Sequence, residues 1–308
     1  MSNFPPWFSV QQQSGSDVTL PCGNGTEPNR SIMKPPPHQS GMEKPVSKLI
    51  PISPQTHSDF RWRRPSNFLF TGKDHLIPLG LREMNNATLG LPAGFIRLQD
   101  KFLLVGIQGF RNGENLVVDE NGKWLAVHLP DGYQGYPLRM IRLDQERYQV
   151  CVEEESELVK PKEAVPDDAA EWRPFFDDEG KLADPVSHLV NQMQKHAADL
   201  GAAERATARL AELELIKEWE ITAGDEKSPL QVKGLYTVDQ ARLAQLDGDS
   251  LVSLRDCGAL YLIYVQLLSG FHMSGLIRIG QRRWKKPEEV ELDFGEIDDT
   301  GNISFDNL

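Results

Sequence analysis

Cysteine is scarce in this chain. The 308 residues include only Cys22, Cys151 and Cys257, which are far apart and form no CxxC pair. A disulfide framework or a structural zinc site is therefore not expected. We predict free thiols, as in proteins of a reducing compartment.

A secretory signal and a long apolar run are also missing. The first ten residues lack a basic segment followed by an apolar one. The longest strongly apolar run, 259–268, is interrupted by Gln266, whereas a membrane-spanning helix needs about 20 apolar residues. We therefore expect no transmembrane span, which excludes a channel or a transporter permease. The expected location is the cytoplasm, and the alternative is the cell surface by a route without an N-terminal signal.

Positive charge is in deficit. The chain has 33 Lys and Arg against 45 Asp and Glu, a formal net charge of -12. Such a surface repels phosphate backbones and anionic lipid. We therefore expect no nucleic-acid partner.

Local motifs of catalysis and metal binding are absent from the sequence. No two of the seven histidines are three or four residues apart, and no HExxH, GxSxG or GxGxxG pattern occurs. The prediction is no catalytic residue, no metal and no cofactor. A site assembled in space from scattered histidines and acids remains the alternative, and a pocket lined by His128, Asp177 or His188 would favour it.

Composition divides the chain into parts. Residues 1–57 are rich in proline, serine and glycine and are interpreted as a disordered leader. The predicted fold class is α+β, a mostly antiparallel β-rich N-terminal half (58–155) packed with a helical C-terminal half (175–276) that holds a helix hairpin, a strand pair and short helices. The two halves are expected to share one core. A charged tail fills 277–308.

Short apolar runs separated by turn residues predict an antiparallel sheet over about 66–155. Its expected strands are 68–70, 76–81, 102–107, 115–118, 123–129, 138–143 and 147–152. Asn121-Gly122 favours a type I′ hairpin. Residues 153–174 are interpreted as a long loop. The segments 117–123 and 175–181 echo each other, and we interpret them as two acidic glycine turns rather than as a repeat.

Helical periodicity follows from Asp184. The pattern predicts one helix over 184–200, a break at Gly201 and an antiparallel second helix over 202–217. A strand pair is expected at 219–221 and 232–238. Asp239 and Asp249 are expected to cap short helices, and the apolar run 259–268 is expected to lie in the interior.

The C-terminal end carries basic residues around one tryptophan. Arg278, Arg282, Arg283, Lys285 and Lys286 surround Trp284, a composition able to grip a phosphate or stack a base. Acidic residues follow at 288–299, so self-neutralisation or docking to another protein is the favoured interpretation.

Several segments resemble one bacterial family. They are Asp59-Phe60-Arg61, GENLVVDENGKW (113–124), Tyr136-Pro137-Leu138, CVEE (151–154), FFDDEG (175–180), GLYTVD (234–239) and the run 250–260. In order and spacing they are similar to the SapC family over residues 57–273. The resemblance implies a role in a bacterial surface layer linked to serum resistance. It also brings a peptide-transport permease label, which the lack of an expected membrane span contradicts. It implies no catalytic residue.

Three functional hypotheses follow. The first is a non-enzymatic accessory protein that binds an unidentified protein partner, with homo-oligomerisation as a further option. The second is a surface-layer or envelope component, and the third is an enzyme, or an enzyme's partner, acting on peptides. The candidate binding residues are aromatic, acidic and histidine side chains, namely Trp124, His128, Tyr136, Asp177, Asp178, Tyr236 and Trp284.

Overall fold

The computed structural model describes residues 49–143, 147–166, 169–225 and 228–284. The chain divides into two compact units, each built from two separate stretches of sequence. Unit 1 comprises the residues up to Arg63 together with Pro137–Lys181. Unit 2 comprises Arg64–Tyr136 and the residues from Leu182 onward.

Unit 1 holds two small antiparallel sheets. In the first, β7 (Tyr148–Glu153) lies between β1 (Leu49–Pro51) and β6 (Leu138–Arg142). In the second, β2 (Phe60–Trp62) lies between β8 (Val159–Pro161) and β9 (Arg173–Pro174). The helices α1 (Pro54–His57) and η3 (Lys162–Ala164) are short.

The core of unit 1 contains a fully buried histidine. His57 lies with its ring 5.7 Å from the ring of Phe175, which also contacts Trp62. Thr56 Oγ1 is 2.6 Å from His57 Nδ1, and Glu154 is 4.0 Å from Nε2. Burial lowers the pKa of His57, with the Glu154 charge opposing that change. The imidazole therefore favours its neutral form.

Unit 2 is built on a five-stranded antiparallel sheet. Its strand order is β10 (Ile216–Glu218), β13 (Leu235–Val238), β4 (Ala93–Leu98), β5 (Lys101–Ile107) and β3 (Leu76–Pro78). Successive side chains of a strand point to opposite faces. Phe95 and Leu104 thus join one hydrophobic cluster, whereas Ile96 and Ile107 join another. Both faces of this sheet are covered.

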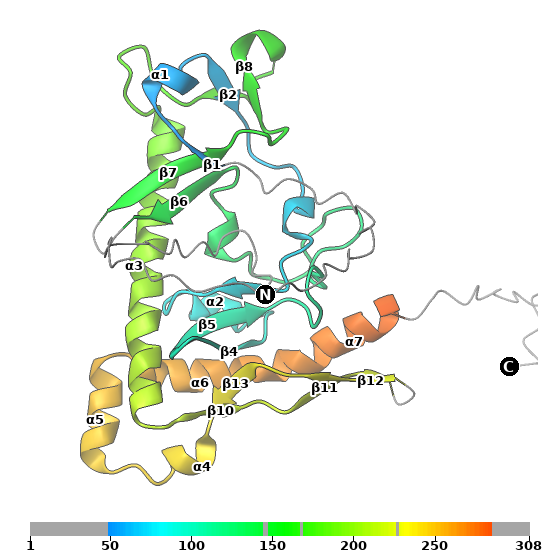
Figure 1. Ribbon diagram of the computed structural model, residues 1–308, viewed down its shortest axis with the longest axis vertical. Coiled ribbons are helices and arrows are strands. Elements are labelled where there is room, and N and C mark those ends of the chain that lie inside the picture. The colour runs from blue at the N-terminus through cyan, green and yellow to red at the C-terminus, as the bar shows by residue number, and fades with distance from the viewer. Residues whose placement is uncertain (1–48, 144–146, 167–168, 226–227, 285–308) are drawn as a thin grey trace, which may run out of the picture. The chain divides into compact units, whose positions relative to one another are not determined.

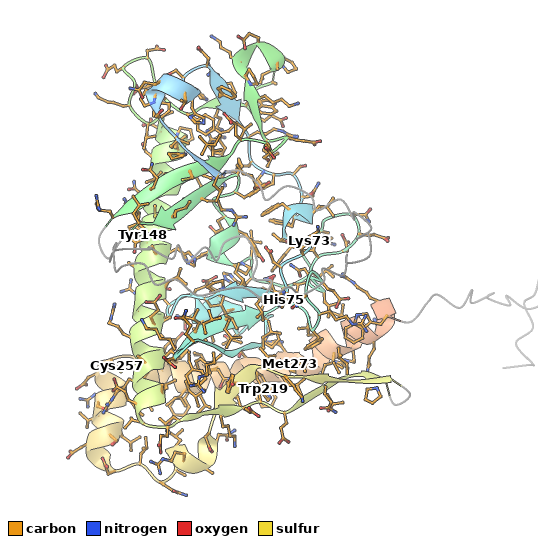
Figure 2. All side chains as sticks on the ribbon, in the orientation of Figure 1. Lys73, His75, Tyr148, Trp219, Cys257 and Met273 are labelled. Carbon is orange, nitrogen blue, oxygen red and sulfur yellow. The ribbon has the colours of Figure 1, made fainter. Side chains whose placement is uncertain are left out.

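Other elements of unit 2 surround the sheet. They are η1 (Leu69–Thr71), α2 (Met84–Ala87), η2 (Asp131–Tyr133), α3 (Asp184–Glu212), the hairpin of β11 (Ile221–Asp225) and β12 (Ser228–Val232), α4 (Gln240–Leu243) and α5 (Gly248–Asp256). The last are α6 (Ala259–Ser269), η4 (Gly270–His272) and α7 (Met273–Trp284). Figure 1 shows α6 and α7 as one almost continuous rod beside β13 and β11. Figure 2 labels Trp219 and Met273, which lie close together in the second cluster.

A buried glutamine joins α6 to the sheet. β13 and β4 pair at Leu235 with Ile96 and at Tyr236 with Phe95. Gln266 is fully buried, accepts a hydrogen bond from Val238 N at 3.2 Å and donates one to Ala93 O at 3.1 Å. Its side-chain amide continues the ladder where the two backbones no longer pair.

The predicted fold class is confirmed: the sheets are antiparallel, and the helices are concentrated towards the C-terminus. Strands β5, β6 and β7 agree with three of the predicted strands. The predicted helix hairpin is wrong, because α3 is a single helix of 29 residues. Gly201 lies inside it, and a Cβ there would meet only the end of the Arg205 side chain at 3.5 Å. Glycine lowers helix propensity but does not end a helix whose flanks are held by packing.

Several predicted strands are also wrong. Residues 69–71 form η1, and the segments 115–118 and 123–129 contribute only an isolated bridge between Val118 and Trp124. β4 was missed, and the expected loop 153–174 contains β8 and β9. The single strand pair expected after α3 is in fact two, since β10 pairs with β13 and β11 with β12. In sequence, an apolar segment that packs on a sheet has the same pattern as a strand within that sheet.

Turn and cap predictions had mixed outcomes. The type I′ turn is wrong because only Gly122, and not Asn121, has a positive φ. The hydrogen bonds from Gly122 N to Asp119 O and from Asp119 N to Lys123 O instead close a three-residue loop. Asp239 caps α4 as predicted. The cap of α5 is Asp247 rather than Asp249.

The predicted segment limits need adjustment at both ends. β1 and α1 lie within the range interpreted as a leader, and the rest of that range, 1–48, lies outside the described residues. Residues 277–284 continue α7, and 285–308 lie outside the described residues. The predicted free thiols are confirmed for Cys151 and Cys257, and burial raises the pKa of Cys151.

Candidate functional site

An exposed stripe runs along the α6–α7 rod. It consists of residues spaced by four, three, four, three and four positions, namely Tyr264, Leu268, Phe271, Gly275, Arg278 and Arg282. Residues at such spacing lie on one face of a helix. Tyr264, Leu268 and Phe271 are 57%, 58% and 79% exposed. The prediction that the run 259–268 lies in the interior is therefore wrong for this face.

The two ends of the stripe differ in chemistry. One half is apolar and the other is basic, with Gly275 between them, where an added Cβ would meet nothing within 4 Å. The guanidinium groups of Arg278 and Arg282 have no ion-pair or hydrogen-bond partner among residues that the structure describes. The stripe therefore offers both apolar contact and unused positive charge.

Neighbouring segments widen the apolar half. Nε2 of His272 lies 2.6 Å from Thr88 O, which places the exposed Leu89 next to η4. A Cβ on Gly90 would lie 3.0 Å from the backbone nitrogen of Val127, another exposed apolar residue. Two further exposed apolar side chains, Leu89 and Val127, thus lie on loops of unit 2, and Leu89 is next in sequence to the residue that contacts η4.

The rod also bears on the expected absence of a membrane span. By length and composition, the run Ala259–Trp284 is one helical segment able to cross a membrane, with 33% of the most apolar window buried. Its opposite face contributes the fully buried Leu262, Ile263 and Gln266 to unit 2. The expectation that the chain has no segment long and apolar enough to cross a membrane is therefore wrong by length and composition, although one face of this segment packs in the core of unit 2.

Aromatic candidates predicted from the sequence have structural contacts. Tyr136 stacks on Phe70 with ring centroids 4.0 Å apart, and Tyr236 meets Phe102 edge to face. Trp284 donates Nε1–H to Glu114 Oε1 at 2.7 Å. Tyr136 and Tyr236 thus pack against neighbouring rings, and Trp284 holds the end of α7 on the loop after β5.

The basic cluster around Trp284 is partly used inside unit 2. Arg111 lies over the Trp284 ring at 4.3 Å. Arg283 donates to the carbonyl oxygens of Asn115 and Val118 at 2.8 and 2.6 Å. Lys285, Lys286 and the acidic stretch lie outside the described residues. The Arg283 guanidinium is therefore held by backbone carbonyl groups, and among the described residues no carboxylate pairs with it.

Asp177 and Asp178 lie in a surface turn. Both are exposed, and Asp177 Oδ1 accepts the backbone N–H groups of Glu179 and Lys181. Asp119 makes the same two bonds to Asn121 and Lys123. The echo in the sequence is thus two copies of one local turn, as predicted. Asp177 acts as a turn residue.

His128 joins a cluster that no sequence motif indicated. Its Nε2 is 3.0 Å from Oε1 of Glu83, a carboxylate only 1% exposed. The same oxygen accepts the Asp131 N–H at 2.8 Å, and Oε2 accepts the Gly80 N–H at 3.1 Å. His196 Nδ1, from α3, is 3.7 Å from Oε2. We call Glu83, His128, Asp131 and His196 the mixed cluster.

The charged groups of the mixed cluster act on one another's protonation. Burial raises the pKa of Asp131, and the negative charge of Glu83 adds to this effect, whereas the two histidines oppose it. Among the described residues, the donor atoms of Glu83, His128 and Asp131 lie within 4.8 Å of one another. These three side chains are the set best placed to hold a metal ion.

Distant segments position Glu83. Asp199 of α3 accepts the N–H groups of Arg82 and Glu83 at 3.0 and 3.2 Å, while the Glu83 carboxylate binds the N–H of Gly80. This reciprocal pattern resembles a capping box whose aspartate comes from another helix. A Cβ on residue 80 would collide with the Asp199 carboxylate, so Gly80 is required.

Glu83, Asp131 and His196 were missed because their sequence spacing carries no signal. His188, an earlier candidate, is exposed on α3 and does not join them. Trp124 supports the cluster by donating Nε1–H to His128 O at 2.7 Å. The stripe had only a weak signal in the sequence: Tyr264, Phe271 and Arg278 are seven residues apart, so the helical spacing continues past the apolar run.

Comparison with known proteins identifies the family. The model of the SapC family matches residues 52–276. The chain belongs to the SapC family. No curated protein and no solved structure was found to match it. The SapC match includes the mixed cluster and the apolar half of the stripe, whereas Arg278, Arg282 and Trp284 lie beyond its end.

Proposed function

We propose that this SapC-family protein is a non-enzymatic accessory protein that binds a partner through the exposed stripe. The observation that supports this is the row of Tyr264, Leu268 and Phe271, three large apolar side chains more than half exposed on one helical face. With aromatic side chains of roughly 150–250 Å² each, the two rings alone expose on the order of 250 Å². With Leu268 added, the patch approaches the size of the largest apolar patch on a typical monomer, roughly 300–600 Å², which is often a functional surface.

The occupant that fits is an amphipathic helix of a partner protein. The alternating spacing of four and three residues is that of the seam between two packed helices. Apolar residues of the partner would cover the stripe from Tyr264 to Phe271, and acidic residues would meet Arg278 and Arg282. An anionic membrane fits less well, because the chain as a whole carries a net charge of -12.

Photo-crosslinking in the native cell tests this proposal. A photoreactive amino acid replaces Leu268 or Phe271 in the full chain. Leu69, which is 54% exposed on η1, is the matched control. We expect both stripe positions to crosslink the same protein, at a helical segment with apolar and acidic residues, and Leu69 to give no such product. An Arg278→Glu change should reduce the yield.

Other products would contradict the proposal. They are crosslinks to lipid, to a second copy of this chain or to residues 285–308, and equal products from all three positions. The surface-layer role that the family resemblance implies stays a prediction, and cell fractionation tests it. Protein found only in the cytosol would exclude that role without affecting the helix-binding proposal.

A further inference from the structure

We propose that Glu83, His128 and Asp131 form a binding site for a divalent transition metal ion, with His196 as a fourth ligand. This inference is independent of the stripe, because none of the four residues belongs to it. The expectation from the sequence was that no metal site exists.

The donor set suits such an ion. Two carboxylates and imidazole nitrogen are the ligands of zinc and of other divalent first-row metals in proteins. Ligand atoms at about 2.0–2.2 Å from a tetrahedral zinc are roughly 3.4 Å from one another. The three donors already lie within 4.8 Å, and His128 Nε2 is 3.0 Å from Glu83 Oε1. Small side-chain rotations bring them to coordinating distance.

A supporting shell holds the ligands in place. The backbone N–H groups of Gly80 and Asp131 fix the Glu83 carboxylate. Gln134 Nε2 donates to Asp131 Oδ1 at 2.7 Å. Metal ligands in proteins are oriented by hydrogen bonds of this kind. The residues that supply these hydrogen bonds are close in sequence to Glu83 and Asp131, so the same local folding positions the ligands and the groups that orient them.

Two features are not explained by hydrogen bonding within the fold alone. The buried Glu83 carboxylate and the partly buried Asp131 carboxylate have donor atoms within 4.8 Å of each other, and a cation between them would offset the repulsion of the two charges. The buried Nδ1 of His196 faces Glu83 and has no hydrogen-bond partner among the described residues. A divalent cation would offset the first and give the second a partner.

The alternative is that the His128–Glu83 contact only ties two loops together. Two conservative variants separate these explanations. Asp131→Asn keeps the backbone N–H that binds Glu83 but removes a charged ligand. His128→Gln keeps an N–H donor for Glu83 but removes the imidazole. Neither should unfold the protein, and circular dichroism and the melting temperature check this. His188→Gln, at an exposed position of α3, is the matched control.

The experiment is a calorimetric titration of the full chain with Zn²⁺ after treatment with a chelator and dialysis. We expect one ion per chain. Each of the two cluster variants should weaken its binding by at least about tenfold, the smaller loss typical of removing even a supporting group. His188→Gln should bind like the wild type. Bound Zn²⁺ should also raise the melting temperature of the wild type more than that of the variants.

Three results would overturn the proposal. One is the absence of binding in wild type, which leaves the tie between loops as the whole role of the cluster. A second is binding that both variants retain. The third is binding that His188→Gln weakens as much as they do, which would mean adventitious surface coordination.

Discussion

Replacing Gln266 by leucine tests how α6 is attached to the sheet of unit 2. The change removes the acceptor of Val238 N–H and the donor to Ala93 O, both in the buried interior. An unsatisfied buried backbone group costs about 1–3 kcal/mol. The two together cost roughly 2–6 kcal/mol, and the apolar gain of leucine offsets about 1–2 kcal/mol. These figures span about 0–5 kcal/mol, and we expect a net loss near the middle of that range, roughly 2–3 kcal/mol.

Urea unfolding followed by circular dichroism measures this loss. The control is Gln192→Leu, the same chemical change at an exposed position of α3. The control should stay within about 0.5 kcal/mol of the wild type. A Gln266→Leu protein as stable as the control would show that the glutamine does not complete the ladder.

Three further predictions concern local features. Gly122 and Gly180 both have positive φ, but a Cβ on Gly122 would lie 2.8 Å from Asn67, whereas one on Gly180 meets nothing within 4 Å. In thermal unfolding, Gly180→Ala should therefore lose about 1–2 kcal/mol, and Gly122→Ala should lose more. Burial lowers the pKa of His57 below 6.5, so on acidification this histidine is protonated in the unfolded chain before it is protonated in the folded chain. The free energy of unfolding should therefore fall as pH decreases below about 6.5, and a His57→Gln variant should show a flatter pH dependence. Asp239→Ala should lower the melting temperature, since Asp239 caps α4 through two backbone N–H groups, and an unchanged melt would contradict this.

Periodicity predicted the secondary structure best where one face of an element is buried and its neighbours are close in sequence. β5 alternates between the two clusters of unit 2, and α3 begins at Asp184 as its sequence indicates. The pattern failed where the same apolar residues cover a sheet without joining it. Lys123–Leu129 alternates like a strand, but it lies on the surface of unit 2 with Leu125 and Val127 exposed.

The candidate sites also differ in how far the sequence could predict them. Asp177 acts locally, so its turn was predictable from four consecutive residues. The mixed cluster combines Glu83, His128 and His196 from three segments, and only the tertiary fold brings them together. For the stripe, the sequence showed an apolar run but not which of its sides the core uses. Leu262 and Leu268 differ in exposure, not in type.

Hydroxyl-radical footprinting shows whether a partner covers the stripe in the presence of the other proteins of the cell. The oxidation of Tyr264 and Phe271 is compared between the purified full chain and the same chain in a native cell extract, with Leu69 as the internal reference. We predict that oxidation of Tyr264 and Phe271 falls in the extract while that of Leu69 does not change. Equal oxidation of all three residues in both samples would contradict it.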